Sequence, residues 1–167
     1  MKLLISSFLF SALTVAQINP DQQYEFVDFF RMAFAKSYIG LDQMRDPETG
    51  KWQFETAVGD FDRCSIRYDL EKGVHVIDLI RFTESEGTAN QIMNRMAGQL
   101  ASAMPVEQFK RSDRTDSGKK RIHYVHRSND ASVRAKNPEV VITTDQREGK
   151  SMLIISLYEP IQKTTGK

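Results

Sequence analysis

The sequence predicts an α+β fold, a two-layer sandwich in which one antiparallel sheet carries helices on one face, in the order α-βββ-α-ββββ. Three observations indicate it. Two segments repeat apolar residues at helical spacing, and seven shorter segments alternate apolar and polar residues or are largely apolar. Turns of hairpin length join most neighbouring strands, which favours antiparallel pairing. The length of 167 residues and the hydrophobic share of 40% fit one domain with its own core.

The first predicted helix begins near Asn19. This residue can cap the helix, and Pro20 suits the first helical position that follows it. It ends near Gly40. We interpret its apolar stripe as facing the core; the stripe comprises Phe26, Val27, Phe30, Ala33, Phe34 and Tyr38. The alternative is that Tyr24 and Phe29 lie outside the stripe and contact a partner or a ligand.

Three strands are predicted next, over 52–58, 64–70 and 74–82. The first two alternate apolar and polar residues, as half-buried strands do. The third follows a Glu-Lys-Gly turn and is apolar on both faces, so we place it in the interior of the sheet; the exceptions are His75, Asp78 and Arg81.

A second helix is predicted from a capping box at 88–91 to Pro105. Its apolar stripe comprises Ile92, Met93, Met96, Ala97, Leu100, Ala101 and Met104. The last four strands are expected over 109–114, 121–127, 139–144 and 152–158. Residues 128–138 are predicted to form a loop, and residues 160–167 a flexible tail.

The first 16 residues predict a secretory signal peptide. Lys2 is followed by an apolar run from Leu3 to Val15, and the small residue Ala16 marks the expected cleavage point. The run has 13 residues, whereas spanning a bilayer takes about 20. We therefore expect no membrane span in the mature chain, residues 17–167. A leader ending in Ala-Gln resembles those of exported Gram-negative proteins, which implies a periplasmic or secreted location.

Charge is distributed unevenly along the mature chain. Residues 17–105 contain 9 basic and 14 acidic side chains, and residues 106–136 contain 9 basic and 4 acidic ones. The mature chain as a whole is neutral, which argues against nucleic acid as a partner. The asymmetry favours a charged partner, and a homodimer is one form that this association could take.

Motifs for common catalytic chemistries are absent from the sequence. No Gly-x-Ser-x-Gly and no glycine-rich phosphate loop occurs. The one cysteine, Cys64, falls on the apolar face of a predicted strand, where burial would make its thiol unreactive. His123 and His126 are three residues apart on a strand and so point to opposite faces. We expect no metal site and no cofactor.

Asp78 interrupts an apolar strand, where a carboxylate is costly unless it is paired. We expect it to form a salt bridge across the sheet, with Arg67 or Arg121.

The predicted hairpin 109–127 is the best candidate for a binding site. Basic residues are concentrated there, although strand alternation divides them between two faces. They are Lys110, Arg111, Arg114, Lys119, Lys120, Arg121 and Arg127. The contact residues that we expect are Arg111, Lys119, Lys120, Arg121 and Tyr124. The alternative is a solvated hairpin whose charges only prevent aggregation.

These observations favour an exported, non-enzymatic binding domain of the bacterial envelope, whose partner is a protein or an anionic surface ligand. Two alternatives stay open. One is a hydrolase or isomerase with a pocket between helix and sheet that contains Asp78, His75 or His123. The other is a binder of a small apolar ligand, in a cavity lined by Phe26, Phe30 and Phe34.

Overall fold

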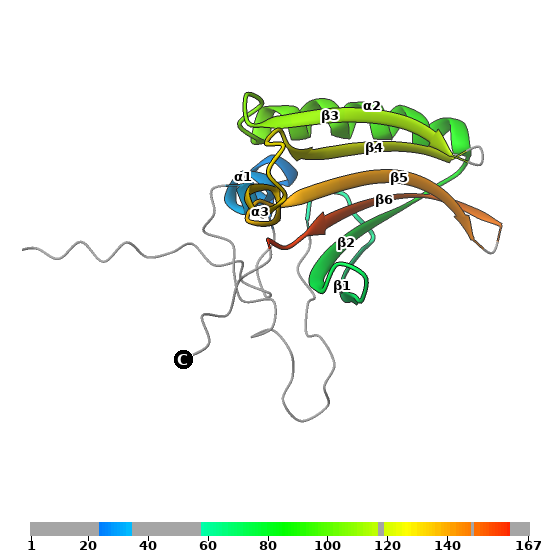
Figure 1. Ribbon diagram of the computed structural model, residues 1–167. Helices are drawn as coiled ribbons and strands as arrows, with labels where there is room; N and C mark the ends of the chain where they lie inside the picture. Colours follow the sequence, from blue (N-terminus) through cyan, green and yellow to red (C-terminus); the bar gives the residue numbers. More distant parts are fainter. Residues whose placement is uncertain (1–23, 35–57, 117–118, 148, 161–167) are drawn as a thin grey trace, which may run out of the picture.

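Six antiparallel strands form one sheet, which confirms the predicted two-layer α+β fold (Figure 1). The computed structural model describes residues 24–34, 58–116, 119–147 and 149–160. The strands are β1 (Arg63–Asp69), β2 (Val74–Thr83), β3 (Phe109–Asp116), β4 (Lys119–His126), β5 (Glu139–Arg147) and β6 (Lys150–Tyr158). Their order across the sheet is β1-β2-β6-β5-β4-β3, so β2 lies in the interior as predicted.

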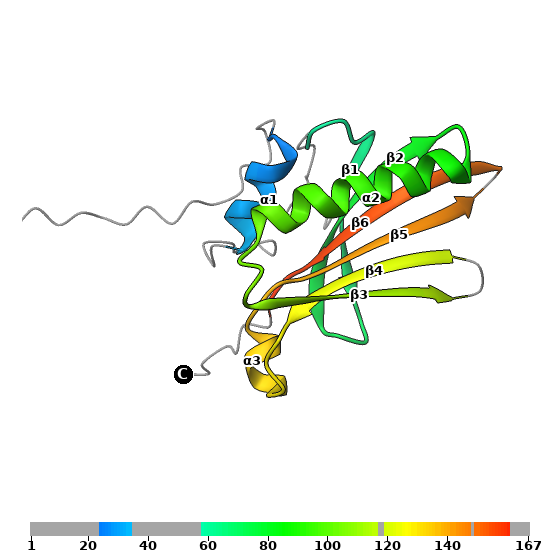
Figure 2. The same ribbon diagram turned by 90° about the horizontal axis from the view of Figure 1, so that it is seen from above.

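The helices are α1 (Phe26–Phe34), α2 (Glu86–Ala103) and α3 (Ala131–Ala135). Figure 2 shows α2 lying over the sheet, where it contacts β2, β5 and β6, while α1 packs against α2. The predicted start of α2 was wrong. Its N-cap is Ser85, whose hydroxyl accepts a hydrogen bond from the backbone N–H of Thr88. Thr88 therefore lies inside the first turn, because the earlier serine already satisfies that N–H group.

The short helix α3 replaces part of the loop predicted over 128–138. Asp130 caps it by accepting a hydrogen bond from the backbone N–H of Ser132. Five residues are too few to produce a recognisable apolar stripe, which is why periodicity did not predict it. Several predictions lie outside the described residues: the leader, both ends of the first helix, the strand over 52–57 and the tail after 160.

The two faces of the sheet differ in what covers them. Strand alternation and the register define a helix face, which carries Ile66, Ile77, Leu79, Ile122, Ile142 and Ile155. With α1 and α2 this face forms the hydrophobic core. The opposite face, here called the open face, carries Arg67, Asp78, Ser156, Val141, His123, Arg121 and Arg114. Neither α1 nor α2 covers the open face.

The aromatic residues of α1 pack together in the core. The ring of Phe30 lies 4.8 Å from that of Phe26 and 5.3 Å from that of Phe29, and Phe34 packs on Phe109 at 4.9 Å. Tyr24 and Phe29 are both buried, which agrees with the core-facing interpretation and contradicts the alternative that they extend outside the core. These rings fill the space in which a small apolar ligand would have to lie.

No helix among the described segments is long and apolar enough to cross a membrane.

Candidate functional site

The β3–β4 hairpin places the predicted basic residues in three different environments. Some are paired with carboxylates, one predicted contact residue is buried, and others are exposed without an acidic partner. These differences decide which side chains are available to a ligand.

Arg111 is neutralised by its own strand. Its Nε and Nη2 atoms donate to the two carboxylate oxygens of Asp113, at 2.6 Å each, and both side chains lie on the helix-face side of β3. The hydrogen bonds with Asp113 raise the pKa of Arg111, and those with Arg111 lower the pKa of Asp113. This bidentate pair leaves Arg111 little capacity to recognise a further anion.

Tyr124 belongs to the core. It is 3% exposed, and its hydroxyl donates to the backbone carbonyl of Ala97 in α2 at 3.1 Å. Burial raises the pKa of its phenol. The side chain holds α2 against β4 and does not extend to the surface that we expected it to join.

Lys119 is paired as well. Its ammonium group contacts the carboxylate of Asp145 on β5, which also accepts from Arg147 at 3.0 Å. The hydrogen bond from Lys119, together with that from Arg147, lowers the pKa of Asp145 to about 2. The positive charge of Lys119 is therefore largely compensated inside the molecule.

Four exposed cations on the hairpin have no ion pair among the described side chains. They are Lys110, Arg114, Lys120 and Arg121, here called the unpaired cations. Arg114 and Arg121 lie directly opposite each other in the β3–β4 register, on the open face. Two like charges in that position destabilise a sheet, so an anion placed between them would relieve repulsion.

A depression of about 230 Å³ lies beside these cations. Residues of α2 and of both hairpin strands line it: Met93, Asn94, Asp113, Arg114, Thr115, Lys120, Arg121 and Ile122. Among the described residues that line it, the one carboxylate is that of Asp113, which is already bound by Arg111. The depression lies on the helix-face side of the hairpin, where Lys120 is its unpaired cation, whereas strand alternation places the side chains of Arg114 and Arg121 on the open face. Its volume is large enough for one acidic side chain.

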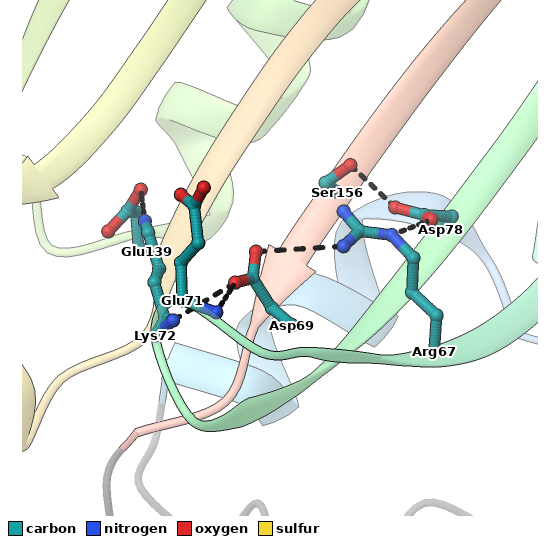
Figure 3. A network of polar contacts seen from close by, with 7 residues as sticks. All are labelled: Arg67, Asp69, Glu71, Lys72, Asp78, Glu139 and Ser156. Carbon is teal, nitrogen blue, oxygen red and sulfur yellow. Dashed lines mark hydrogen bonds and ion pairs between the residues drawn. The ribbon is translucent and has the colours of Figure 1, made fainter.

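A second polar cluster lies on the other half of the open face (Figure 3). Asp78 is 9% exposed; it accepts from Nε of Arg67 at 2.7 Å and from the hydroxyl of Ser156 at 2.5 Å. The predicted salt bridge across the sheet is confirmed, and its partner is Arg67 rather than Arg121. These bonds compensate the buried carboxylate, which gives Asp78 a structural role.

The residues considered for acid–base catalysis do not converge. His123 and Asp78 share the open face, but the register places the whole of β6 and β5 between their strands. His75 follows the helix-face alternation and contacts Glu159 at 3.2 Å. The structure thus does not bring these three into one pocket. Likewise, within the described segments no group of three or more His, Cys, Asp or Glu residues is arranged to hold a metal ion.

Glu139, on the open face, has a strongly shifted pKa. Burial alone would raise its pKa, but contacts with His123 and Lys72 lower it to about 2. Lys72 donates at 2.5 Å, and Nε2 of His123 lies 2.9 Å from the same oxygen, in a direction that does not make a hydrogen bond.

The stability of the protein is expected to depend on this carboxylate in acid. Its pKa in the folded state, about 2, lies below the ordinary value of 4.5, so its contribution is complete above about pH 4.5 and is lost as the pH falls towards 2. We expect Glu139→Gln to remove about 2 kcal/mol of unfolding free energy at pH 6. Urea titrations between pH 6 and pH 2 measure this. A smaller fall should remain in the variant, because Asp145 titrates in the same interval. A pH dependence identical to wild type would contradict the assignment.

Cys64 packs against the hydrophobic core, and burial raises the pKa of its thiol to about 11. At neutral pH it is protonated, as the sequence predicted for a cysteine on the apolar face of a strand.

A second cavity lies between α2 and the ends of β5 and β6. It has a volume of about 250 Å³ and is lined by Glu86, Ala89, Lys119, Thr144, Asp145, Gln146 and Ser151. Opposite charges meet in it, since Lys119 and Asp145 pair with each other, so it has no net preference for an anion.

No protein-family model matches the chain, and no curated protein sequence matches it.

The sequence could have indicated Lys110 and Arg114 more strongly than it did. Both alternate with Ser112 on one face of β3, which is the face that Arg121 shares. The alternation was readable, but the pairing of Arg111 and Lys119 with carboxylates was not.

Proposed function

We propose that this protein is a non-enzymatic binding domain, exported to the periplasm or beyond, which binds an anionic partner through the unpaired cations of the β3–β4 hairpin. The single observation that supports it is the contrast between two sets of charges. Arg111 and Lys119 each have a carboxylate partner, whereas Lys110, Arg114, Lys120 and Arg121 have none among the described side chains.

Repulsion between two of the unpaired cations favours the binding of an anion. Arg114 and Arg121 face each other across two strands that are already held together by main-chain hydrogen bonds. An acidic residue at either position would stabilise the hairpin. Retaining two arginines there costs stability, and a ligand that carries carboxylate, sulfate or phosphate groups recovers it on binding.

Thr143 extends the surface onto β5. It lies opposite Arg121 in the β4–β5 register, and its hydroxyl is engaged only with backbone carbonyls, of Lys120 and Thr144, each at 3.3 Å. These are long hydrogen bonds, so the hydroxyl could donate to a bound anion instead at little cost.

Export is supported by the N-terminal leader, which has the pattern of a signal peptide.

Retention on a polyanion tests the proposal. On immobilised polyglutamate, we expect the variant Arg114→Ala/Arg121→Ala to elute at lower salt than wild type and to bind roughly tenfold more weakly, because two charge-assisted contacts are lost. The matched control is Arg31→Ala/Arg147→Ala, which removes the same charge from exposed arginines that are paired with Asp28 and Asp145.

The control decides between a site and a general charge effect. If the binding is specific to the hairpin, the control variant elutes close to wild type. Equal weakening of both variants would mean that net charge alone drives retention, and the proposed site would be wrong. Circular dichroism of both variants verifies that the fold is kept.

A further inference from the structure

We propose that the anionic partner is an acidic peptide segment that binds in extended form as a seventh, antiparallel strand beside β3. This inference rests on the proposed function and specifies its partner and its binding geometry. It combines a strand edge that has no neighbour within the described part of the chain with the charges that flank it.

β3 is an edge strand of the described sheet, with β4 on one side only. The backbone N–H of Arg127 donates to the carbonyl of Gln108 at 2.7 Å, which identifies Gln108 as a residue whose main chain points towards β4. Main-chain direction alternates along an antiparallel strand. Residues 110, 112 and 114 therefore bond to β4, while the main-chain groups of Arg111, Asp113 and Thr115 point outwards.

The carbonyl of Phe109 is already bound by a side chain. It accepts from Nε of Arg127 at 2.7 Å, a side chain that reaches it from beyond the end of β4. That bond marks one end of the free edge. From Arg111 to Thr115, the outward main-chain groups have no hydrogen-bond partner among the described residues, and these are the groups with which an added strand forms its ladder.

The side chains of β3 determine which strand fits. On the open face it presents Lys110, Ser112 and Arg114, two of which are unpaired cations. Residues of an added antiparallel strand opposite these three would form non-hydrogen-bonded pairs, in which side chains approach most closely. Glutamates at these alternate positions would therefore lie against Lys110 and Arg114, and Arg121 on β4 reinforces the field.

A second copy of β3 is a poor occupant of the same edge. In the antiparallel register centred on Ser112, Lys110 of one copy would lie opposite Arg114 of the other, and these like charges repel. Charged edge strands commonly prevent such self-pairing. The same charges favour a strand of opposite sign, so the edge is selective rather than simply blocked.

N-methylated peptides distinguish strand addition from simple charge attraction. The probe is a fluorescent peptide of the length of β3, with glutamate and threonine alternating, titrated with the purified protein and followed by anisotropy. In the proposed geometry the threonine N–H groups point at β3 and the glutamate N–H groups point away. We expect methylation of the threonine nitrogens to weaken binding by about tenfold or more, and methylation of the glutamate nitrogens to change it less than about twofold.

The outcomes separate the two proposals. If both methylated peptides bind like the unmodified one while Arg114→Ala/Arg121→Ala still weakens binding, the anionic site stands and strand addition is wrong. Loss on methylation of the glutamates instead would also overturn the antiparallel geometry. If the unmodified peptide binds equally well to wild type and to the double variant, the site itself is wrong.

Discussion

Replacing Phe30 by alanine is expected to lower the free energy of unfolding by about 3–5 kcal/mol, the range for truncating a buried phenylalanine. Phe30 is fully buried and its ring contacts those of Phe26, Phe29 and Phe34. Truncation would leave a cavity at the centre of this aromatic cluster, which holds α1 in the core. Urea unfolding followed by far-ultraviolet circular dichroism measures the effect.

The control for this cluster is Phe30→Leu, which keeps most of the apolar volume. We expect it to lose less than half as much as the alanine variant, because the remaining cavity is smaller. A loss below about 1 kcal/mol for Phe30→Ala would be typical of a surface substitution. It would show that α1 contributes little to the stability of the fold.

The second large effect is expected at Arg67. Replacing it by alanine leaves Asp78 as a buried carboxylate with only Ser156 as a partner. Removing one member of a buried pair costs about 3–5 kcal/mol. The side chain of Arg67 is 44% exposed, so water can replace part of the lost interaction. We therefore expect a loss of about 2–3 kcal/mol, measured in the same urea assay.

Arg63→Ala is the matched control for Arg67. It lies four residues earlier on the same strand and face, where its guanidinium packs over the ring of Phe82 at 5.4 Å. We expect it to cost less than about 1 kcal/mol. The double variant Arg67→Ala/Asp78→Asn should recover part of the loss, because no buried charge remains. Equal effects of Arg63→Ala and Arg67→Ala would contradict the role assigned to Asp78.

Periodicity predicted most of the fold correctly because it depends on which side of each element is buried. Alternation located β1, an apolar run after a turn located β2, and strand-like segments flanking turns located all four C-terminal strands to within a few residues, while helical spacing located α2. Helix-capping signals located the start of α2 less reliably. The sequence analysis placed the capping box at Thr88, whereas the structure caps the helix at Ser85 and so begins it earlier.

Periodicity did not predict the order of the strands across the sheet. Hairpin turns predicted the pairs β1–β2, β3–β4 and β5–β6, but not that β6 would lie beside β2. That pairing joins residues far apart in the chain, and its energy comes from burying both strands beneath α2. It also makes β3 an edge strand, and the strand-addition proposal depends on this position.

The candidate site shows the same division between local and tertiary information. The sequence by itself determined that basic residues are concentrated on one hairpin and that alternation divides them between its faces. Only the tertiary structure decided which of them are available. Asp145 reaches Lys119 from β5, α2 buries Tyr124, and the conformation of β3 lets Asp113 bind Arg111. Charge is a property of composition, but whether a charge is compensated depends on distances of a few ångströms between residues that folding brings together.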